Sequence, residues 1–139
     1  VKDWSNDLVA HQRNFRALRA TGRPVAMLSS YTMGLMASFL VGADGAISGM
    51  GSVTADLQVE LFEACQKGDL DGARRIDDRL APLVRVFYAP PFLDMHNRMK
   101  EALAILGRID RAIVRPPLQP VSDEERTAIR AALVRAGLV

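Results

Sequence analysis

Short apolar runs alternate with amphipathic stretches along the first half of the chain. The runs at residues 24–29 and 43–48 are short and flanked by glycine or proline, which favours buried strands. Residues 1–2 have the character of a strand end whose beginning is missing. Apolar positions at helical spacing follow each of these segments, and a glycine stands where each helix should stop. The sequence therefore predicts three strand–helix pairs, with helices at residues 8–21, 33–41 and 54–67, the last capped by Thr54.

This regular alternation implies parallel strands joined by right-handed crossovers. The helix at residues 33–41 carries no charged residue, so we expect other parts of the chain or another subunit to cover it. Three such apolar strands with so few helices leave two open edges and a bare face. The pattern therefore predicts that strand partners are missing, and that the strands belong to a closed barrel or to a sheet covered on both sides.

The second half of the chain shows helical periodicity only. One helix is predicted over residues 69–88 and a second over residues 95–106, and prolines separate them. A last helix begins after Ser122, which forms a capping box with Glu125. We therefore divide the chain into a strand–helix part, residues 1–68, and a helical part, residues 69–139.

Composition and charge narrow the classes of protein and partner. With 139 residues, 49% of them hydrophobic and 24% charged, the chain can bury one globular core. The net charge is +2, and acidic and basic residues are mixed along the sequence, so we expect no nucleic-acid partner. Residues 24–43 are uncharged over a length that could cross a bilayer, but proline, glycine and hydroxyl residues interrupt them. A membrane span is therefore not expected.

A few single residues add to this picture. The only cysteine, Cys65, excludes an intrachain disulfide and fits a reducing compartment, so we expect a cytoplasmic protein. The chain begins with Val1 rather than methionine and shows no leader pattern, so it looks cut from a longer one. His11 and His96 do not stand at metal-ligand spacing, and we expect no metal site. We interpret His11, on the apolar side of its helix, as a structural histidine with satisfied hydrogen bonds.

Several motifs, taken in order, resemble the C-terminal part of the family that includes dihydrodipicolinate synthase and N-acetylneuraminate lyase. Residues 1–3 (Val-Lys-Asp) resemble the end of the sixth strand of its (β/α)8 barrel, and residues 28–30 (Leu-Ser-Ser) resemble the end of the seventh. Residues 42–48 (Gly-Ala-Asp-Gly-Ala-Ile-Ser) are similar to the eighth strand and the turn before it. Residues 68–75 and 114–122 look like connections within the family's extra C-terminal helices. Each motif is weak alone, and their order along the whole chain carries the resemblance.

This resemblance implies an α/β fold in which the chain supplies strands 6–8 of a TIM barrel, followed by a three-helix C-terminal extension. It also implies that Lys2 forms an imine with substrate, near the carboxyl end of a strand, where barrel enzymes carry their chemistry. A lysine amine attacks a ketone only when it is neutral, and an apolar barrel mouth favours that form. From the residues alone, Lys2 would be taken for an exposed lysine at a chain start.

Four further positions are candidates for substrate binding: Ser29, Ser30, Ile47 and Gly49. The serines would shape the pocket or bind a substrate carboxylate or hydroxyl, although they could equally cap the next helix. Ile47 would pack beside the imine or simply fill the barrel core. Gly49 would let the backbone approach a ligand, or would only turn the chain. The resemblance implies no cofactor, and it places the family's proton-shuttle tyrosine and threonine pair on strands that this chain lacks.

Several positions depart from the family pattern. Ser30 stands where the family commonly has glycine, and Gly49 stands where the sialic-acid lyase type has a serine. Residues 95–100 (Met-His-Asn-Arg-Met-Lys) replace the Asn-Pro-Ile-Pro-Val-Lys of the biosynthetic synthase. We interpret Arg98 in this stretch as a solvated helix-face arginine, with a reach toward the active-site mouth or a subunit contact as the alternative. The Lys-Asp pair at residues 2–3, where most relatives have Lys-Glu, resembles the dehydratases of keto-deoxy sugar acids.

The first functional hypothesis is therefore a class I lyase that forms a lysine imine with pyruvate or another 2-oxo acid. It would cleave, condense or dehydrate a 2-keto-3-deoxy sugar acid, and this fragment alone is expected to be inactive. We expect its partners to be this small-molecule substrate and further copies of itself, in a homo-oligomer. One alternative is 4-hydroxy-tetrahydrodipicolinate synthase, against which the departure at residues 95–100 counts. A second is a non-catalytic interaction domain, in which the helical part is functional and Lys2 is incidental.

Overall fold

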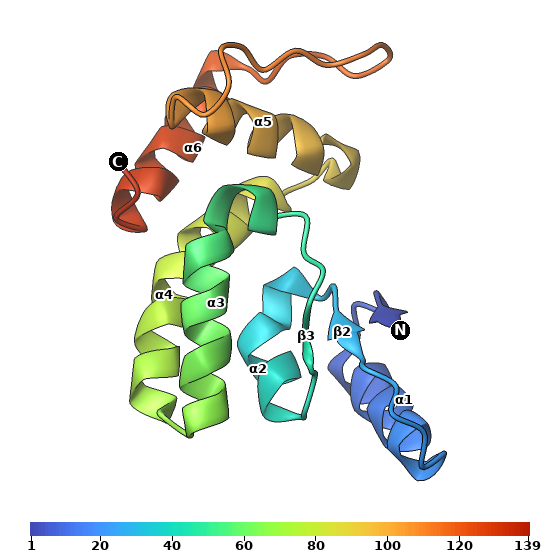
Figure 1. The fold of residues 1–139 in the computed structure, drawn as a ribbon. Coiled ribbons are helices and arrows are strands. Elements are labelled where there is room, and N and C mark those ends of the chain that lie inside the picture. Colours follow the sequence, from blue (N-terminus) through green and yellow to red (C-terminus); the bar gives the residue numbers. More distant parts are fainter. The chain divides into compact units, whose positions relative to one another are not determined.

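The computed structural model describes residues 1–139, which form two compact units, residues 1–77 and residues 78–139. The boundary falls inside a long helix, α4 (Leu70–Phe87), which contributes turns to both units. The strands and the first three helices belong to the first unit, and the last two helices belong to the second (Figure 1).

The first unit is built around a parallel three-stranded sheet in the order β1-β2-β3. The strands are β1 (Lys2–Asp3), β2 (Leu28–Ser29) and β3 (Gly45–Ala46). Lys2 pairs with Leu28, and Leu28 pairs with Gly45, so these residues form one row across the sheet. The parallel order predicted from the alternating sequence pattern is confirmed.

The strands are shorter than the apolar runs that predicted them: β2 takes the last two residues of its run, and β3 takes the middle two. In the first run, the chain turns before it enters β2, because the Val25 N–H donates to the Arg23 carbonyl at 2.8 Å. Single hydrogen bonds extend the pairing beyond the strand ends. One of them runs from the Ile47 N–H to the Ser29 carbonyl at 2.8 Å.

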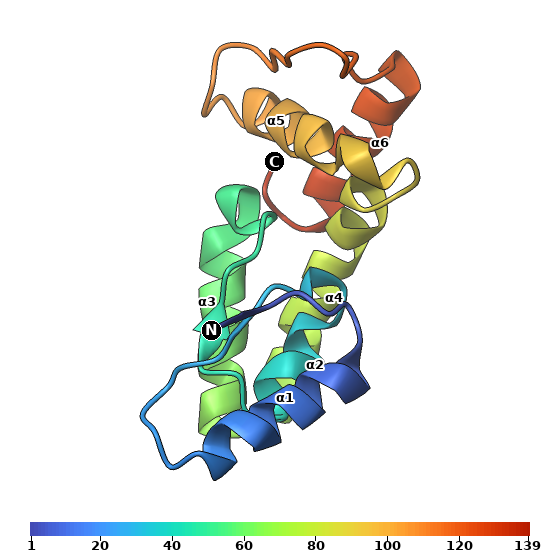
Figure 2. The ribbon, with the colours of Figure 1, turned by 90° about the vertical axis from the view of Figure 1, so that its right-hand side faces the viewer.

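Three helices accompany this sheet. Helix α1 (Leu8–Ala20) is capped by Asp7, whose carboxylate accepts the N–H groups of Val9 and Ala10. Helix α2 (Leu35–Leu40) lies between α1 and α3 (Gly51–Lys67) and packs against β2 (Figures 1 and 2). The rings of Phe39 in α2 and Phe62 in α3 meet edge to face, with centroids 5.1 Å apart. Apolar packing between the helices thus holds this layer together.

Two helix starts differ from the prediction. The helix expected at residues 33–41 is divided, because a 3-10 turn at Thr32–Gly34 precedes α2. The third helix begins at Gly51 rather than at Thr54. Thr54 nevertheless interrupts it, since its backbone (φ −126°, ψ 34°) is not helical and kinks α3. Gly68 ends α3 with a left-handed backbone conformation, φ 72°, so the helix end predicted at this glycine is confirmed.

The second unit packs α5 (Met95–Ile105) against α6 (Asp123–Arg135), and a 3-10 turn at Phe92–Asp94 leads into α5. The predicted capping box of α6 is confirmed. The Ser122 hydroxyl accepts the Glu125 N–H, and the Glu125 carboxylate accepts the Ser122 N–H. The core of this unit consists of almost fully enclosed apolar side chains: Leu80, Leu83, Phe87, Met99, Ala102, Ile129, Ala132 and Leu133.

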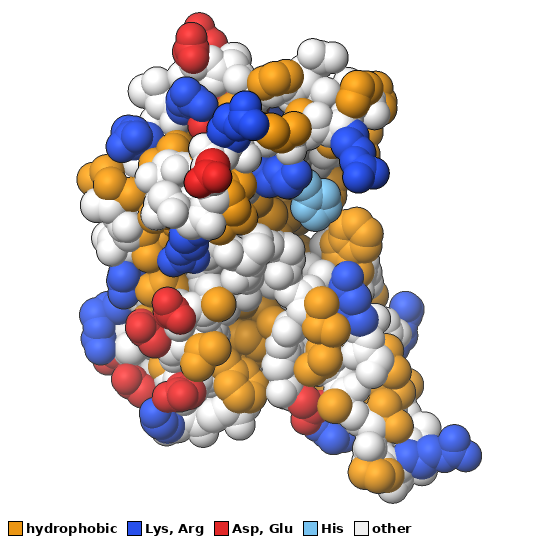
Figure 3. All heavy atoms as spheres, turned by 45° about the horizontal axis from the view of Figure 1, so that its top comes forward, with side chains coloured by type: hydrophobic (Ala, Val, Ile, Leu, Met, Phe, Trp, Pro, Cys, Tyr) orange, Lys and Arg blue, Asp and Glu red, His pale blue; other side chains and the backbone are white.

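Two features of the structure concern the membrane and the nucleic-acid partner that the sequence did not predict. No helix combines the length and the apolar character that crossing a bilayer requires. The uncharged residues 24–43 contain strand β2, a 3-10 turn and the short helix α2. Acidic and basic side chains are interspersed over the face shown in Figure 3.

Candidate active site

The two faces of the sheet carry different chemistry. Neighbouring residues of a strand point to opposite faces, and paired residues of parallel strands point to the same face. The row of Lys2, Leu28 and Gly45 therefore lies on one face, and Ser30 and Ile47, two positions further on, follow it there. The Leu28 side chain lies 3.2 Å from the place where a Cβ would stand on Gly45, which agrees with this assignment.

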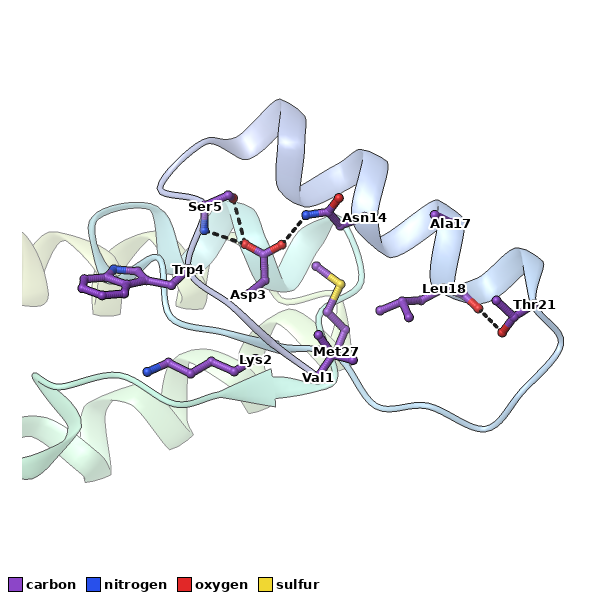
Figure 4. Close-up of a pocket in the computed structure, with 10 residues that line it drawn as sticks. All are labelled: Val1, Lys2, Asp3, Trp4, Ser5, Asn14, Ala17, Leu18, Thr21 and Met27. Carbon is purple, nitrogen blue, oxygen red and sulfur yellow. Dashed lines mark hydrogen bonds between the residues drawn. The ribbon is translucent and has the colours of Figure 1, made fainter.

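Lys2 extends its amine along this face. Its side chain is exposed, and its Nζ lies 5.7 Å from the centre of the Trp4 ring. Figure 4 shows Lys2 running toward Trp4 and away from Asp3. Both Lys2 and Trp4 line a pocket of about 530 Å³ at the β1 edge of the sheet, together with Leu18 and Met27. Asp3 and Asn14 also line this pocket, so it extends over both faces of the β1 edge.

Asp3 points to the opposite face, where 7% of its surface is exposed. Its Oδ1 accepts the Ser5 N–H at 2.9 Å and the Ser5 hydroxyl at 2.8 Å, and its Oδ2 accepts the Asn14 amide at 2.8 Å. Burial alone raises the pKa of this carboxyl, but the hydrogen bonds and the neighbouring His11 outweigh it and lower the pKa from 3.8 to about 2. Asp3 is therefore a fixed negative charge at neutral pH.

His11 lies on α1 beside this carboxylate and is fully buried. Its Nδ1 is 3.7 Å from Oδ1 of Asp3, which is longer than a hydrogen bond, and neither ring nitrogen has a hydrogen-bond partner. The expectation that the hydrogen bonds of His11 are satisfied is therefore wrong.

The two serines that follow Leu28 lie on different faces. Ser29 is fully buried, and its hydroxyl donates to the Ser38 hydroxyl of α2 at 3.0 Å and accepts the Tyr31 N–H at 3.2 Å. Ser30 is half-buried on the face of Lys2. Neither hydroxyl caps α2, because the N-terminus of this helix, at the N-cap residue Gly34, has no side-chain hydrogen bond. Ser29 thus fixes β2 to α2, whereas Ser30 lies on the face of the candidate imine.

The segment after β3 brings two further candidates to this end of the sheet. Ile47 is 47% exposed on the face of Lys2, and Gly49 lies in the exposed turn that leads into α3. The side chain of Ser48, which lies between them in sequence, is fixed by hydrogen bonds. Its hydroxyl lies 2.8 Å from the Thr32 hydroxyl and accepts the Gln58 amide at 3.2 Å. These contacts tie the segments that follow β2 and β3 to each other and to α3.

The structure therefore brings Lys2, Ser30 and Ile47 to one face and places Ser29 on the other. Their roles toward a substrate stay predictions. Sequence analysis did not single out the buried cluster of Asp3, Asn14 and His11. The signal for it was the strand alternation, because the residue after a lysine that faces the barrel interior must face the helices, where a carboxylate needs partners.

Comparison with known proteins identifies the kind of barrel to which these strands belong. The sequence profile of the dihydrodipicolinate synthetase family matches residues 1–136. The chain belongs to this family. The resemblance of the ordered motifs, from the Lys-Asp pair at residues 2–3 to the connector at residues 114–122, is thereby confirmed.

Two relatives within the dihydrodipicolinate synthetase family show how much of a whole protein the chain represents. It is 37% identical over 141 residues to the 4-hydroxy-tetrahydrodipicolinate synthase of Rhodopseudomonas palustris (strain BisA53), covering 100% of the chain and 45% of that protein. It is 28% identical over 135 residues to Escherichia coli K12 YagE, provisionally named a 2-dehydro-3-deoxy-D-gluconate aldolase, covering 96% of the chain and 43% of that protein. The chain thus spans less than half the length of these relatives.

Crystal structures of family members share the fold. Dihydrodipicolinate synthase from Acinetobacter baumannii, complexed with pyruvate, superimposes with a TM-score of 0.83 at 26% identity, over 99% of this chain and 45% of that one. YagE in complex with pyruvate gives a TM-score of 0.86 at 23% identity, over 99% and 46% of the two chains. These likenesses confirm the expected fold class, the last strands of a (β/α)8 barrel followed by C-terminal helices.

Our interpretation of Arg98, one of the positions that depart from the family pattern, was wrong. We expected a solvated side chain, but Arg98 is 2% exposed. Its guanidinium donates to the Glu125 carboxylate at 2.9 Å, to the Pro90 carbonyl at 3.2 Å and to the Ala89 carbonyl. Arg98 thus satisfies carbonyl groups just after the end of α4. At this position the departure from the biosynthetic synthase contributes to the packing of the C-terminal helices.

Proposed function

We propose that this chain is the C-terminal part of a class I lyase in which Lys2 forms an imine with pyruvate or another 2-oxo acid. The observation that carries the proposal is the place of Lys2 near the carboxyl end of β1, on the same face as Ser30 and Ile47. Barrel enzymes hold their reacting groups at the carboxyl ends of the strands. Membership of the family and the pyruvate complex of the Acinetobacter baumannii relative support a 2-oxo acid as the ligand.

The proposed reaction begins with the Lys2 amine. The neutral amine attacks the ketone carbon C2 of the 2-oxo acid, and loss of water leaves a C=N bond to Nζ. This imine withdraws electrons from C3, which loses a proton and gives an enamine. The enamine attacks an aldehyde carbon and forms a C–C bond. In the reverse direction the C4 hydroxyl gives up its proton to an acceptor, the C3–C4 bond breaks and the aldehyde leaves. The enamine then takes up a proton at C3, and hydrolysis of the resulting imine releases pyruvate.

The remaining candidate residues take different parts in this proposal. Ser30 would donate a hydrogen bond to a carboxylate or hydroxyl oxygen of the substrate, and Ile47 would pack beside the imine. Gly49 would allow the backbone to approach the ligand. Ser29 enters only as a residue that fixes β2, because its hydroxyl is bound to Ser38. Three strands cannot surround a substrate, so groups from other barrel strands would complete the site.

The proposed second reactant is the aldehyde part of a 2-keto-3-deoxy sugar acid. The Lys-Asp pair at residues 2–3 and the likeness to YagE support this class. The other candidate function is 4-hydroxy-tetrahydrodipicolinate synthesis, which the 37% identity to the Rhodopseudomonas palustris enzyme favours. The departure at residues 95–100 from the pattern of the biosynthetic synthase counts against it.

Borohydride trapping tests the imine. The longest natural form of the protein is incubated with pyruvate and reduced, and the adduct is located by peptide mass spectrometry. We expect the reduced pyruvyl group on Lys2. Lys67, paired with Glu63, and Lys100, bound to the Ile113 carbonyl, are internal controls and should stay unmodified. A folded protein without an adduct on Lys2 would contradict the proposal and make the non-catalytic interaction domain the leading explanation.

Product assays then separate the two candidate functions. Release of pyruvate from 2-keto-3-deoxygluconate would support the sugar-acid lyase. Formation of 4-hydroxy-tetrahydrodipicolinate without that cleavage would support the synthase instead. Both assays use the protein that gave the adduct, so that a failed reaction is not confused with a missing imine.

We also propose that the protein forms a homo-oligomer. Met33 and Leu40, at the two ends of the uncharged segment around α2, are 47% and 49% exposed. Exposed apolar side chains in a segment without charge favour a covering partner. Sedimentation velocity of the longest natural form should give more than one copy per particle, and a monomer at micromolar concentration would contradict the proposal.

A further inference from the structure

The backbone on both sides of Lys2 is fixed by the neighbouring strand. The Leu28 N–H donates to the Val1 carbonyl at 2.7 Å, and the Ser30 N–H donates to the Asp3 carbonyl at 2.7 Å. The position of the lysine amine is therefore set by the strand and by the torsions of its own side chain. Any contact that holds the carboxyl end of β1 also places this amine.

The Asp3 carboxylate is the contact that holds this end of β1 to the helix layer. Figure 4 shows Lys2 and Asp3 leaving the strand in different directions, with Asp3 turned toward Ser5 and Asn14. Ser5 begins the turn between β1 and α1, and Asn14 lies in the middle of α1. The three hydrogen bonds of Asp3, at 2.8–2.9 Å, therefore connect strand, turn and helix at one point.

We propose that Asp3 is a positioning residue for the Lys2 amine, acting through the carboxylate anchor that Ser5, Asn14 and the buried ring of His11 surround. This inference rests on the proposed imine chemistry of Lys2. The Asp3 side chain leaves β1 on the face opposite to Lys2, so in this proposal it acts on the amine through the strand.

The donors around Asp3 require a carboxylate in particular. Both of its oxygens accept hydrogen bonds, and an ionised carboxylate is an acceptor only. An asparagine in its place would turn an NH2 group toward the Ser5 or Asn14 donors and lose part of the anchor. The ring of His11, whose Nδ1 lies 3.7 Å from Oδ1, closes the remaining side of the carboxylate. Neither His11 nitrogen donates to it, so the anchor is made by Ser5 and Asn14.

The chain offers a matched control at the other end of the sheet. Asp44 also joins the sheet to α1, because its carboxylate accepts the Met27 N–H at 2.8 Å and the Arg19 guanidinium at 2.6 Å. Asp44 stands just before β3, whereas Lys2 and Asp3 form β1. An Asp44→Asn variant should therefore weaken the fold in a similar way without moving Lys2.

The experiment compares Asp3→Asn, Asn14→Leu and Asp44→Asn with the wild type, each in the longest natural form of the protein. For each, the rate constant of borohydride-trappable adduct formation on Lys2 is measured as a function of pyruvate concentration, beside the thermal midpoint. Asp3→Asn and Asn14→Leu should lower the rate constant at saturating pyruvate by about tenfold, because the amine is misplaced. The half-saturating pyruvate concentration should change less, by about threefold at most. Asp44→Asn should lower the midpoint but keep the wild-type rate.

Three outcomes would overturn the inference. Either of the first two variants could be folded and show the wild-type rate constant. Alternatively, Asp44→Asn could lose rate as much as Asp3→Asn, which would mean that general stability governs the effect. Asn14→Leu leaves the carboxylate in place, so it still decides the matter where Asp3→Asn fails to fold. Finally, a wild-type protein that forms no adduct on Lys2 would contradict both the proposed function and this inference.

Discussion

Arg98 and Glu125 form an ion pair at 2.9 Å that joins α5 to the first turn of α6. The arginine side chain of this pair is 3% exposed, and its other N–H groups are directed at carbonyl oxygens. Arg98→Met should therefore leave several polar groups unpaired and lower the free energy of unfolding by about 3 kcal/mol. Urea denaturation measures this change. The exposed helix position Arg130 serves as control, and Arg130→Met should change stability by at most about 0.5 kcal/mol.

The neighbours Ser29 and Ser30 should respond differently to the same substitution. Ser29→Ala removes a buried hydroxyl pair with Ser38, so the free energy of unfolding should fall by about 1 kcal/mol while the affinity for pyruvate is kept. Ser30→Ala should keep the stability and weaken the binding of the 2-oxo acid by about tenfold, as for one lost charge-assisted hydrogen bond. Denaturation and equilibrium binding, measured on both variants, check the pair. The reverse assignment of effects would show that Ser29, and not Ser30, contacts the ligand.

Asp3 should make the folded protein sensitive to acid. Its pKa is about 2 in the folded state and 3.8 ordinarily, so its contribution is fully present above about pH 4 and is lost as the pH falls toward 2. The contribution amounts to about 2 kcal/mol for a shift of this size. Urea unfolding between about pH 6 and pH 2 should therefore show a shallower loss of stability for Asp3→Asn than for the wild type. Asp56→Asn, at an exposed position of α3, should follow the wild-type curve, and equal slopes for all three proteins would refute the prediction.

Gly42 should tolerate a side chain less well than Gly22. Both have positive φ, 107° and 65°, so alanine is strained at either position. A Cβ on Gly42 would also stand 2.5 Å from the Phe15 ring, whereas one on Gly22 would meet nothing within 4 Å. Gly22→Ala should cost about 1 kcal/mol of stability and Gly42→Ala about 3 kcal/mol. Equal thermal midpoints for the two variants would contradict the close packing of Phe15 on this turn.

The parts of the fold that depend on local sequence could be predicted. Gly68 takes the left-handed backbone that ends α3, and Ser122 with Glu125 forms the capping box of α6. Both signals lie within four residues of the helix end that they define. The parallel direction of the strands followed from the alternation of strands and helices, because parallel neighbours need a crossover connection, which is usually a helix.

Contacts between distant residues could not be predicted in this way. Arg98 lies on a polar position of its helix by periodicity, yet Glu125, 27 residues away, and the carbonyls after α4 enclose it. His11 stood on the apolar side as expected, but its nearest polar group is Asp3 on a strand, at a distance too long for a hydrogen bond. In both cases the sequence predicts the helix face on which the residue lies, but only the folded structure shows which residues pack against that face.

Only part of the candidate site could be predicted, because it too depends on pairing between distant residues. Family resemblance supplied Lys2, and the strand alternation then separates Ser30 from Ser29. The resemblance alone could not make that distinction, because it treated the two serines as one motif. Their different faces became visible only when the register with Lys2 was known.

The one-residue alternation along β1 also limits how this enzyme family can change during evolution. Inserting or deleting a single residue before Lys2 would exchange the two faces, so that Asp3 would enter the barrel and the lysine would point into the helix layer. The exposed turn at residues 21–24 has no such alternation to keep, and it can vary in length without moving either group. Length variation among functional homologues should therefore collect in that turn and be absent between Val1 and Ser5.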